Sequence, residues 1–400
     1  MNSLQLTQQI PIAGEYDVVV VGGGIAGCAA ALAAARDGMR VLLLEKSILL
    51  GGLATGGHVA IYLPLCDGRG RRMTSGIAEE LLLASIAWGG GTLPEAWTQN
   101  PVNPGIHKRY QTEFNVAELV FALDGLLRSA GVDVLFDTLF CQPVMQRNTC
   151  EHVVVENKSG IQAYGCKMVI DASGDADVFF RAGAACDVKT NYLSWWGYGI
   201  NERSLEGARE SMDPFGALRI LILGAHADGA HEPEGRQRYD GTDAWQVSTF
   251  VQHGRRLAEA WAHRDQGKAC IAALGTTPHF RTTRKIRGIA TLVQTQAHSR
   301  IDDSIGCVGD WRTPGPAYEI SFGTLITPDF PNLLACGRIL STSEEMWEVT
   351  RVIPAAALTG QGAGAAAALA IRTQQPLQKL DVPALQQKLA DAHVQIHLPG

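Results

Sequence analysis

The chain has 400 residues, of which 46% are hydrophobic and 18% are charged, and it carries a net charge of −6. Because it has no basic excess, it lacks the charge with which proteins usually hold a nucleic-acid backbone. Its length is ample for a large core and long for one compact unit, which predicts two interleaved domains.

The cysteines and the first 15 residues indicate the cellular compartment of the protein and whether it holds a structural metal. The nine cysteines are scattered, with no Cys-x-x-Cys pair and no cluster with histidine. This argues against a structural metal site and favours a reducing compartment. Residues 1–15 contain neither a basic head nor an apolar stretch, so we expect no signal peptide there. We therefore expect a cytoplasmic location and no bound metal.

The chain opens with the pattern of a complete βαβ unit. Residues 17–24 (DVVVVGGG) predict a buried strand that runs into glycines, and residues 25–37 predict an alanine-rich helix. Residues 40–45 (RVLLLE) predict a second buried strand.

The turn between the first strand and the helix has the spacing Gly22-x-Gly24-x-x-Gly27. Gly22 permits the tight turn, Gly24 lets a pyrophosphate approach the backbone, and Gly27 lets the helix pack closely. The helix N-terminus adds amide donors, and Glu45 is placed to accept hydrogen bonds from ribose hydroxyls. Together these features predict a dinucleotide site, and the alternative is a glycine-rich turn without a ligand. The other contacts predicted here are Ile25, Ala26 and Lys46.

The next part of the chain continues the first domain. Residues 75–88 and 116–130 predict amphipathic helices, separated by a loop over residues 89–115 that is rich in Gly, Pro and Asn. Three short β-type runs within residues 132–171 then predict a small antiparallel meander before a return to the main sheet.

The character of the sequence changes at residue 184, where aromatic residues and histidines become more frequent. We expect an α/β protein in which residues 1–183 and 318–400 form a discontinuous Rossmann-like dinucleotide-binding domain, with a parallel sheet and the small meander. Residues 184–317 are expected to form an inserted α+β substrate domain. The uncharged stretch Val352–Ile371 is long enough for a membrane span, but its many Ala and Gly residues and Pro354 favour a buried helix.

Two later motifs favour FAD over a nicotinamide dinucleotide. Gly51 and Gly52 follow Glu45 closely, in a segment that passes beside the cofactor in FAD proteins. The motif Asp171-Ala-Ser-Gly-Asp175 ends a strand in a turn of the kind that closes the adenine side of many flavoproteins, although it also reads as an ordinary turn. The predicted contacts of these two segments are Gly51, Gly52, Leu53, Ala54, Asp171, Ser173 and Gly174.

The last motif precedes and includes the C-terminal apolar helix. A strand delivers Gly337 and Arg338, and the chain later turns at Pro354 into a helix that contains Gly360. In FAD proteins such a helix points its N-terminus, the positive end of its dipole, at the flavin. Simple helix packing is the alternative.

In this order, the segments resemble the FAD-dependent oxidoreductase family, which is related to fumarate reductase and glucose-inhibited-division flavoproteins. The resemblance runs nearly end to end. It implies bound FAD, a glutathione-reductase-like first domain and oxidoreductase activity. The family's members are mostly of unassigned substrate, so no set of catalytic residues follows from it. The segments that carry it are DVVVVGGGIAGCAAALAAA, GGLATGGHVAIYLPLCDGRGRR, DASGDAD, RTTRKIRG, YEISFGTLITPDFPNLLACGRILS and TRVIPAAALTGQGAG.

Four side chains are candidates for catalysis, each with a structural alternative. The resemblance places His58 near the flavin, where it is a proton carrier, a covalent attachment point or a packed structural residue. Arg281 and Arg284 either bind a substrate carboxylate or the flavin, or form salt bridges. Arg351 precedes the flavin-facing helix and either lines the pocket or pairs with a nearby carboxylate.

Aromatic residues of the inserted region are also ambiguous. Trp195, Trp196 and Tyr198 lie within four consecutive residues. They either wall an active site or pack in the core of the second domain.

The leading hypothesis is an FAD-dependent oxidoreductase that transfers a hydride between a small organic substrate and the flavin N5. Only one dinucleotide fingerprint is present, so electrons are expected to come from the substrate itself or to involve a separate donor or acceptor. One alternative is an RNA-modifying flavoprotein, which the acidic net charge disfavours. The other is a non-catalytic module that retains the flavoprotein fold.

Overall fold

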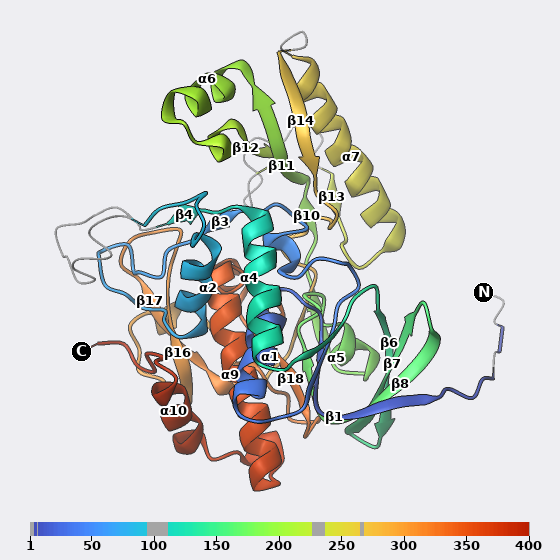
Figure 1. Cartoon of the computed structure of the whole chain (residues 1–400). Coiled ribbons are helices and arrows are strands. Elements are labelled where there is room, and N and C mark those ends of the chain that lie inside the picture. Colours follow the sequence, from blue (N-terminus) through green and yellow to red (C-terminus); the bar gives the residue numbers. More distant parts are fainter. Residues whose placement is uncertain (1–3, 6, 94–110, 226–236, 265–267, 400) are drawn as a thin grey trace.

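A parallel β-sheet forms the centre of the first domain in this computed structural model, which describes residues 4–5, 7–93, 111–225, 237–264 and 268–399 (Figure 1). The strand order is β5-β2-β1-β8-β7-β6, with β18 also paired to β8. Valine runs and other branched apolar residues explain why the central strands are buried on both faces. The strands are β1 (Ile12–Val21), β2 (Val41–Leu44), β5 (Asp133–Leu135), β6 (Leu139–Gln146), β7 (Thr149–Asn157), β8 (Gly160–Asp171) and β18 (Leu333–Ala335).

Strand β8 belongs to both the meander and the parallel sheet. Its first residues pair antiparallel with β7, whereas Val169–Asp171 pair parallel with β18. The predicted meander is therefore confirmed, but the prediction that residues 132–140 form one strand of it is wrong. The structure divides it between β5, which joins the parallel sheet beside β2, and the start of β6.

Two long helices, α1 (Ile25–Arg36) and α9 (Ile353–Thr373), lie side by side against the parallel sheet. Their backbones approach so closely that a Cβ atom at Gly360 would overlap the carbonyl oxygen of Ala26, and one at Gly364 would overlap that of Ala30. Small residues along both helices make this contact possible. Helix α9 is thus the buried helix that its composition predicts.

No single helix among the described residues is long and apolar enough to cross a membrane. Helices α8 (Glu344–Thr350) and α9 reach the required length and apolarity only when taken together, and they meet at an angle of 87°.

The helices predicted over residues 75–88 and 116–130 are α2 (Ile77–Ser85) and α4 (Val116–Ser129), which differ from the prediction by a few residues at their ends. Helices α5 (Asp177–Arg181) and α10 (Val382–Asp391) were not among the predicted elements. The Asn115 side chain accepts a hydrogen bond from the Ala117 N–H, which explains where α4 begins. Most of the predicted loop over residues 89–115 lies outside the described residues, and its end contains β4 (Thr112–Glu113), paired with β3 (Ile61–Tyr62).

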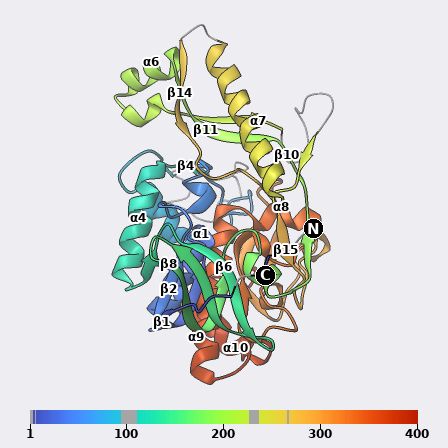
Figure 2. The ribbon, with the colours of Figure 1, turned by 90° about the vertical axis from the view of Figure 1, so that its right-hand side faces the viewer.

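A second, smaller sheet stands above the parallel sheet (Figures 1 and 2). Its order is β12 (Arg219–Gly224), β11 (Ser194–Asn201) and β14 (Ala269–Leu274), and helix α7 (Ala244–His263) packs on it. Helix α6 (Glu202–Ser211) follows β11 directly. The mixture of helix and antiparallel sheet agrees with an α+β insertion, and the boundaries at residues 183/184 and 317/318 stay a prediction.

Three further antiparallel pairs are short. They are β9 (Cys186–Val188) with β15 (Arg284–Ile286), β10 (Asn191–Tyr192) with β13 (Arg238–Tyr239), and β16 (Ser304–Gly309) with β17 (Ala317–Ser321).

Candidate functional site

A pocket opens at the carboxyl ends of β1, β2, β8 and β18, the edge at which open parallel sheets bind ligands. The chain segments that line it come from distant parts of the sequence. Most of the residues expected to contact a cofactor line this pocket: Gly22, Gly24, Ile25, Ala26, Glu45, Lys46, Gly51, Gly52, Leu53, Ala54, Ser173, Gly174, Gly337 and Arg338.

Each glycine of the first loop has a different surrounding. Gly22 has φ +106°, and a Cβ there would lie 2.5 Å from the carbonyl oxygen of Ala172. A Cβ at Gly27 would overlap the carbonyl oxygen of Gly22, so this glycine allows α1 to pack against the strand. At Gly24, by contrast, the nearest atom to a Cβ would be the Gly52 Cα at 4.0 Å, and the residue lines the pocket. The Gly24 backbone is therefore open to a ligand.

Helix α1 presents its N-terminus to the pocket. Gly24 is its N-cap residue and supplies no side-chain hydrogen bond. Amide groups of the first turn are consequently left for a ligand, and the helix dipole favours an anionic one. This arrangement suits a pyrophosphate.

Glu45 is buried at the floor of the pocket beside the glycine loop. Its Oε2 accepts a hydrogen bond from the Gly23 N–H at 2.8 Å, and its Oε1 accepts one from the Ser47 N–H at 2.7 Å. A carboxylate has about four acceptor positions. The side chain is thus fixed by the backbone and retains capacity for ribose hydroxyls.

The turn at Gly51 and Gly52 lies directly against the first loop. Both residues have positive φ, and Gly51 forms a β-bridge with Gly24. A Cβ at Gly52 would lie 3.0 Å from the Gly24 Cα. Glycines are therefore required here by backbone conformation and by the close approach of the two loops.

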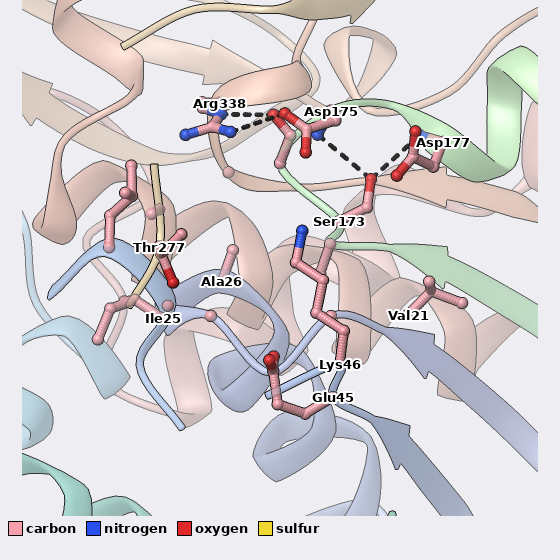
Figure 3. A pocket seen from close by; sticks show the side chains of 18 of the residues that line it. Val21, Ile25, Ala26, Glu45, Lys46, Ser173, Asp175, Asp177, Thr277 and Arg338 are labelled. Carbon is pink, nitrogen blue, oxygen red and sulfur yellow. Dashed lines mark hydrogen bonds and ion pairs between the residues drawn. The ribbon is translucent and has the colours of Figure 1, made fainter. Parts of the chain in front are cut away.

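A hydrogen-bonded chain of side chains borders the pocket opposite Glu45 (Figure 3). Arg338 donates to Asp175 at 2.8 Å, to the Phe280 carbonyl at 2.9 Å and to the Gly174 carbonyl. Burial raises the pKa of the Asp175 carboxyl, but Arg338 and Lys46 outweigh this effect and lower it. Arg338 thereby holds the Gly174 turn in place.

Asp171, Gly27 and Gly360 do not line the pocket. Asp171 is buried and accepts hydrogen bonds from Ser173 on one carboxylate oxygen and from the Val178 and Phe179 N–H groups on the other. It therefore organises the turn and caps α5. Gly27 and Gly360 instead serve the packing of α1. Their assignment as cofactor contacts stays a prediction.

The four catalytic candidates lie in different environments. Arg351 lines the pocket and also forms an ion pair with Glu348 at 2.6 Å. Arg284 does not line the pocket but forms an ion pair at 3.0 Å with Asp177, which does, and its guanidinium lies over the Phe180 ring.

Arg281 donates to the Ala225 carbonyl at 3.0 Å and does not line the pocket. His58 lies four residues beyond the lining residue Ala54 and has φ +54°. Burial lowers the pKa of its imidazole, so the neutral form is favoured. No contact in the structure tests a catalytic role for these side chains.

Sequence reasoning missed several lining residues, including Thr138, Gly241, Thr277 and Phe280. None of them belongs to a local motif, because each reaches the pocket only through the tertiary packing of a distant segment. His279 is also outside the motifs and lies two residues before Arg281. It is buried, its Nδ1 lies 2.9 Å from the Ser194 hydroxyl, and burial together with Arg281, Arg351 and Arg338 holds its pKa well below the usual value.

The sequence profile described as "FAD dependent oxidoreductase" matches residues 17–192 and 227–389, which is most of the chain. The chain belongs to this family. It is an FAD-dependent oxidoreductase, and its cofactor is FAD. This membership favours an enzyme over the non-catalytic alternative. The open Gly24 backbone, the uncapped N-terminus of α1 and the fixed Glu45 carboxylate all fit FAD.

Several proteins resemble this FAD-dependent oxidoreductase over part or most of its length. A digeranylgeranylglycerophospholipid reductase of Methanothermobacter thermautotrophicus is 32% identical over 40% of each chain. A tRNA uridine 5-carboxymethylaminomethyl modification enzyme of Protochlamydia amoebophila is 27% identical over 50% of this chain and 30% of its own. The chain thus matches less than half the length of these curated relatives, and the partial tRNA-enzyme match does not favour RNA modification.

Two solved structures align with most of the chain at low identity. A geranylgeranyl bacteriochlorophyll reductase-like protein of Thermoplasma acidophilum is 15% identical, covers 94% of this chain and 83% of its own, and has a TM-score of 0.49. A p-nitrophenol 4-monooxygenase of Pseudomonas putida is 13% identical, with coverage of 94% and 84% and a TM-score of 0.48.

Proposed function

We propose that this FAD-dependent oxidoreductase acts on a small organic molecule by transferring a hydride to or from the flavin N5. Bound FAD supplies the redox chemistry, and the protein supplies binding, orientation and exclusion of water. The observation that carries the proposal is the pocket in which the Gly24 loop, Glu45 and the start of α9 meet.

Different lining residues would contact different parts of the FAD molecule. The Gly24 backbone and the N-terminal amides of α1 would hold the pyrophosphate, and Glu45 would accept from the adenosine ribose. Ile353 and Ala356, in the first turn of α9, line the same pocket. The positive end of the α9 dipole would there favour electron-rich forms of the flavin.

The supply of electrons is also part of the proposal. The sequence holds one dinucleotide fingerprint, so a nicotinamide would have to come and go as a separate reactant. We therefore expect the substrate itself, or a separate donor or acceptor, to exchange electrons with the flavin. All nine cysteines are free thiols, which supports a reducing, cytoplasmic setting.

The test is the visible spectrum of the purified full chain before and after acid precipitation, followed by anaerobic addition of NADH and NADPH. We expect oxidised-flavin bands that move to the supernatant, as for non-covalent FAD, and no bleaching by either nicotinamide. Bands that stay in the pellet would indicate covalent attachment, with His58 the first residue to replace. A colourless protein that cannot be reconstituted with FAD would contradict the proposal.

A further inference from the structure

Strand β11 presents different side chains to its two sides. Because side chains alternate along a strand, Trp195 lies on the opposite face from Trp196 and Tyr198. Trp195 packs with Leu221 and with Ala258 of α7. Tyr198 instead faces the first domain, and its ring centroid lies 5.2 Å from that of His58.

The boundary between β11 and the segment that contains His58 is here called the seam. Three polar atoms at the seam have no hydrogen-bond partner among the described residues. They are the hydroxyl of Tyr198, the Nε1 of Trp196 and the Nδ1 of His58. All three are buried, and none has a hydrogen-bond partner in the described part of the chain. The Tyr198 side chain as a whole is only 4% exposed. Buried polar groups in folded proteins are almost always hydrogen-bonded, so three such atoms around one seam indicate a ligand group.

The electrostatics of the seam favour an uncharged ligand group. Burial alone lowers the pKa of His58, with no contribution from a neighbouring charge. Burial is also the main cause of the raised pKa of Tyr198, followed by the charge of Glu113. No cation contributes to the pKa of either His58 or Tyr198, so a carboxylate held by these two groups would be desolvated without compensation. The arginines that lower the pKa of His279 contribute to neither of these two pKa values, although the ring centroid of His279 lies 5.3 Å from that of Trp196.

The hydrogen-bonding chemistry specifies an oxygen. The indole Nε1 of Trp196 can only donate, and the phenol of Tyr198 and a protonated Nδ1 of His58 can also donate. Donors of this kind fit a carbonyl or hydroxyl oxygen.

The surroundings of these groups are apolar. The cross-strand partners of Trp196 and Tyr198 on β12 are Ile222 and Ile220, which share their face of the sheet. The ring of Phe215 meets that of Tyr198 edge-on at 6.5 Å. The body of a ligand here would therefore contact aliphatic and aromatic carbon.

The seam adjoins the FAD pocket. His58 continues the turn whose residues Gly52, Leu53 and Ala54 line that pocket. The Thr277 N–H donates to the carbonyl of Gly56 at 3.2 Å, and Thr277 is itself a lining residue. A molecule held at the seam is thus close to the cofactor.

We propose that Tyr198, Trp196 and His58 form the substrate-recognition site, and that the substrate is an apolar molecule with an uncharged carbonyl or hydroxyl oxygen. The proposal rests on the function proposed above, because it places the substrate beside the FAD pocket. It assigns the three residues to binding and positioning of the substrate.

Three probes of similar shape test which polar group the site binds. Acetophenone carries an uncharged carbonyl oxygen, benzoate carries a carboxylate and ethylbenzene carries no polar atom. Each is titrated into the FAD-loaded full chain, and binding is followed by the flavin difference spectrum and by tryptophan fluorescence. We expect saturable binding of acetophenone, and binding of the other two that is about tenfold weaker or more. Equal binding of benzoate or ethylbenzene, or no saturable acetophenone binding, would overturn the proposal.

The Tyr198→Phe variant tests the residue assignment. Because the hydroxyl has no partner in the protein, we expect an unchanged or higher Tm and a full flavin load, with an acetophenone Kd raised about tenfold. The matched control is Tyr62→Phe, since the buried Tyr62 hydroxyl donates to the Ala78 carbonyl at 2.6 Å. That variant should lower Tm and leave the acetophenone Kd unchanged.

A Tyr198→Phe variant that loses stability as Tyr62→Phe does, while binding acetophenone normally, would overturn the assignment. The proposed redox function and the proposed substrate site can also be refuted independently of each other. A colourless protein defeats the proposed redox function, whereas acetophenone quenching of tryptophan fluorescence in that protein still reports on the seam.

Discussion

Gly24 is the position where a side chain should harm the cofactor site while leaving the fold intact. A Cβ there meets nothing closer than 4.0 Å, yet it would enter the pocket where the pyrophosphate is expected. We predict that Gly24→Val abolishes flavin retention without unfolding the protein. The measurement is the flavin-to-protein ratio after gel filtration, with circular dichroism to follow the fold.

The control is Gly207→Val, because a Cβ at Gly207 meets no atom within 4 Å and lies in α6, away from the lining residues. It should retain FAD fully. A Gly24→Val protein that purifies with a full flavin load would show that the loop does not hold the pyrophosphate.

Arg338 ties Asp175, the Phe280 carbonyl and the Gly174 carbonyl together, and a lysine cannot reproduce that fork. We predict that Arg338→Lys lowers the free energy of unfolding by about 2–3 kcal/mol and weakens FAD binding roughly tenfold or more. Denaturant titration and FAD titration of the apoprotein measure the two effects.

Arg287→Lys is the matched control, since the Arg287–Asp187 pair is exposed at 65% and 43%. That change should cost less than about 1 kcal/mol. Equal losses in the two variants would contradict an organising role for Arg338.

For individual residues, the sequence predicts those that belong to a local motif but not those that meet through long-range contacts. The glycine spacing and Glu45 could be interpreted from sequence because strand, turn and helix are contiguous there. Arg284 pairs with Asp177, which is more than 100 positions away in the sequence, and no local sequence pattern predicts this contact. Likewise, the unpartnered atoms of Trp196 and Tyr198 depend on how β11 packs against the segment that contains His58, which no local pattern specifies.

Among the elements, α1 and α9 pack too closely to accommodate added volume between them. A Cβ at Gly360 would overlap the Ala26 carbonyl, and backbone on both sides leaves little room to adjust. We predict that Gly360→Ala lowers the free energy of unfolding by about 2 kcal/mol or more, despite the better helix propensity of alanine. Thermal and urea unfolding measure this loss.

Gly125→Ala in α4 provides the comparison, because nothing lies within 4 Å of a Cβ there. It should raise stability by up to about 1 kcal/mol. A neutral Gly360→Ala would mean that the two helices can separate without cost.

Helices and central strands could be predicted well because their apolar periodicity is a local property. The division of residues 132–140 between two parts of the sheet could not be predicted, since strand pairing depends on partners elsewhere in the chain. The same holds for the sheet of β11, β12 and β14, whose strands are separated by helices and turns.

For the whole molecule, FAD should act as a folding ligand. The lining residues come from both ends of the chain, so the intact pocket exists only in the native state. A ligand that binds only the native state adds about 2.7 kcal/mol of stability when its free concentration is about 100 times Kd. We predict that the Tm of the apoprotein rises continuously with added FAD.

Riboflavin is the control for this titration, because it lacks the pyrophosphate and adenosine that Gly24 and Glu45 are expected to hold. It should raise Tm much less at equal concentration. An equal rise with riboflavin would place the binding energy at the isoalloxazine end alone.

The long separation along the chain between the first and last lining residues also governs when the pocket can form during protein synthesis. Gly22 leaves the ribosome early, whereas Ile353 and Ala356 belong to the penultimate helix. A nascent chain therefore has to keep the βαβ unit competent while some 300 further residues are made. Cofactor supply should accordingly influence the last step of maturation, the docking of α9 onto α1, and leave the earlier folding of the N-terminal strands unchanged.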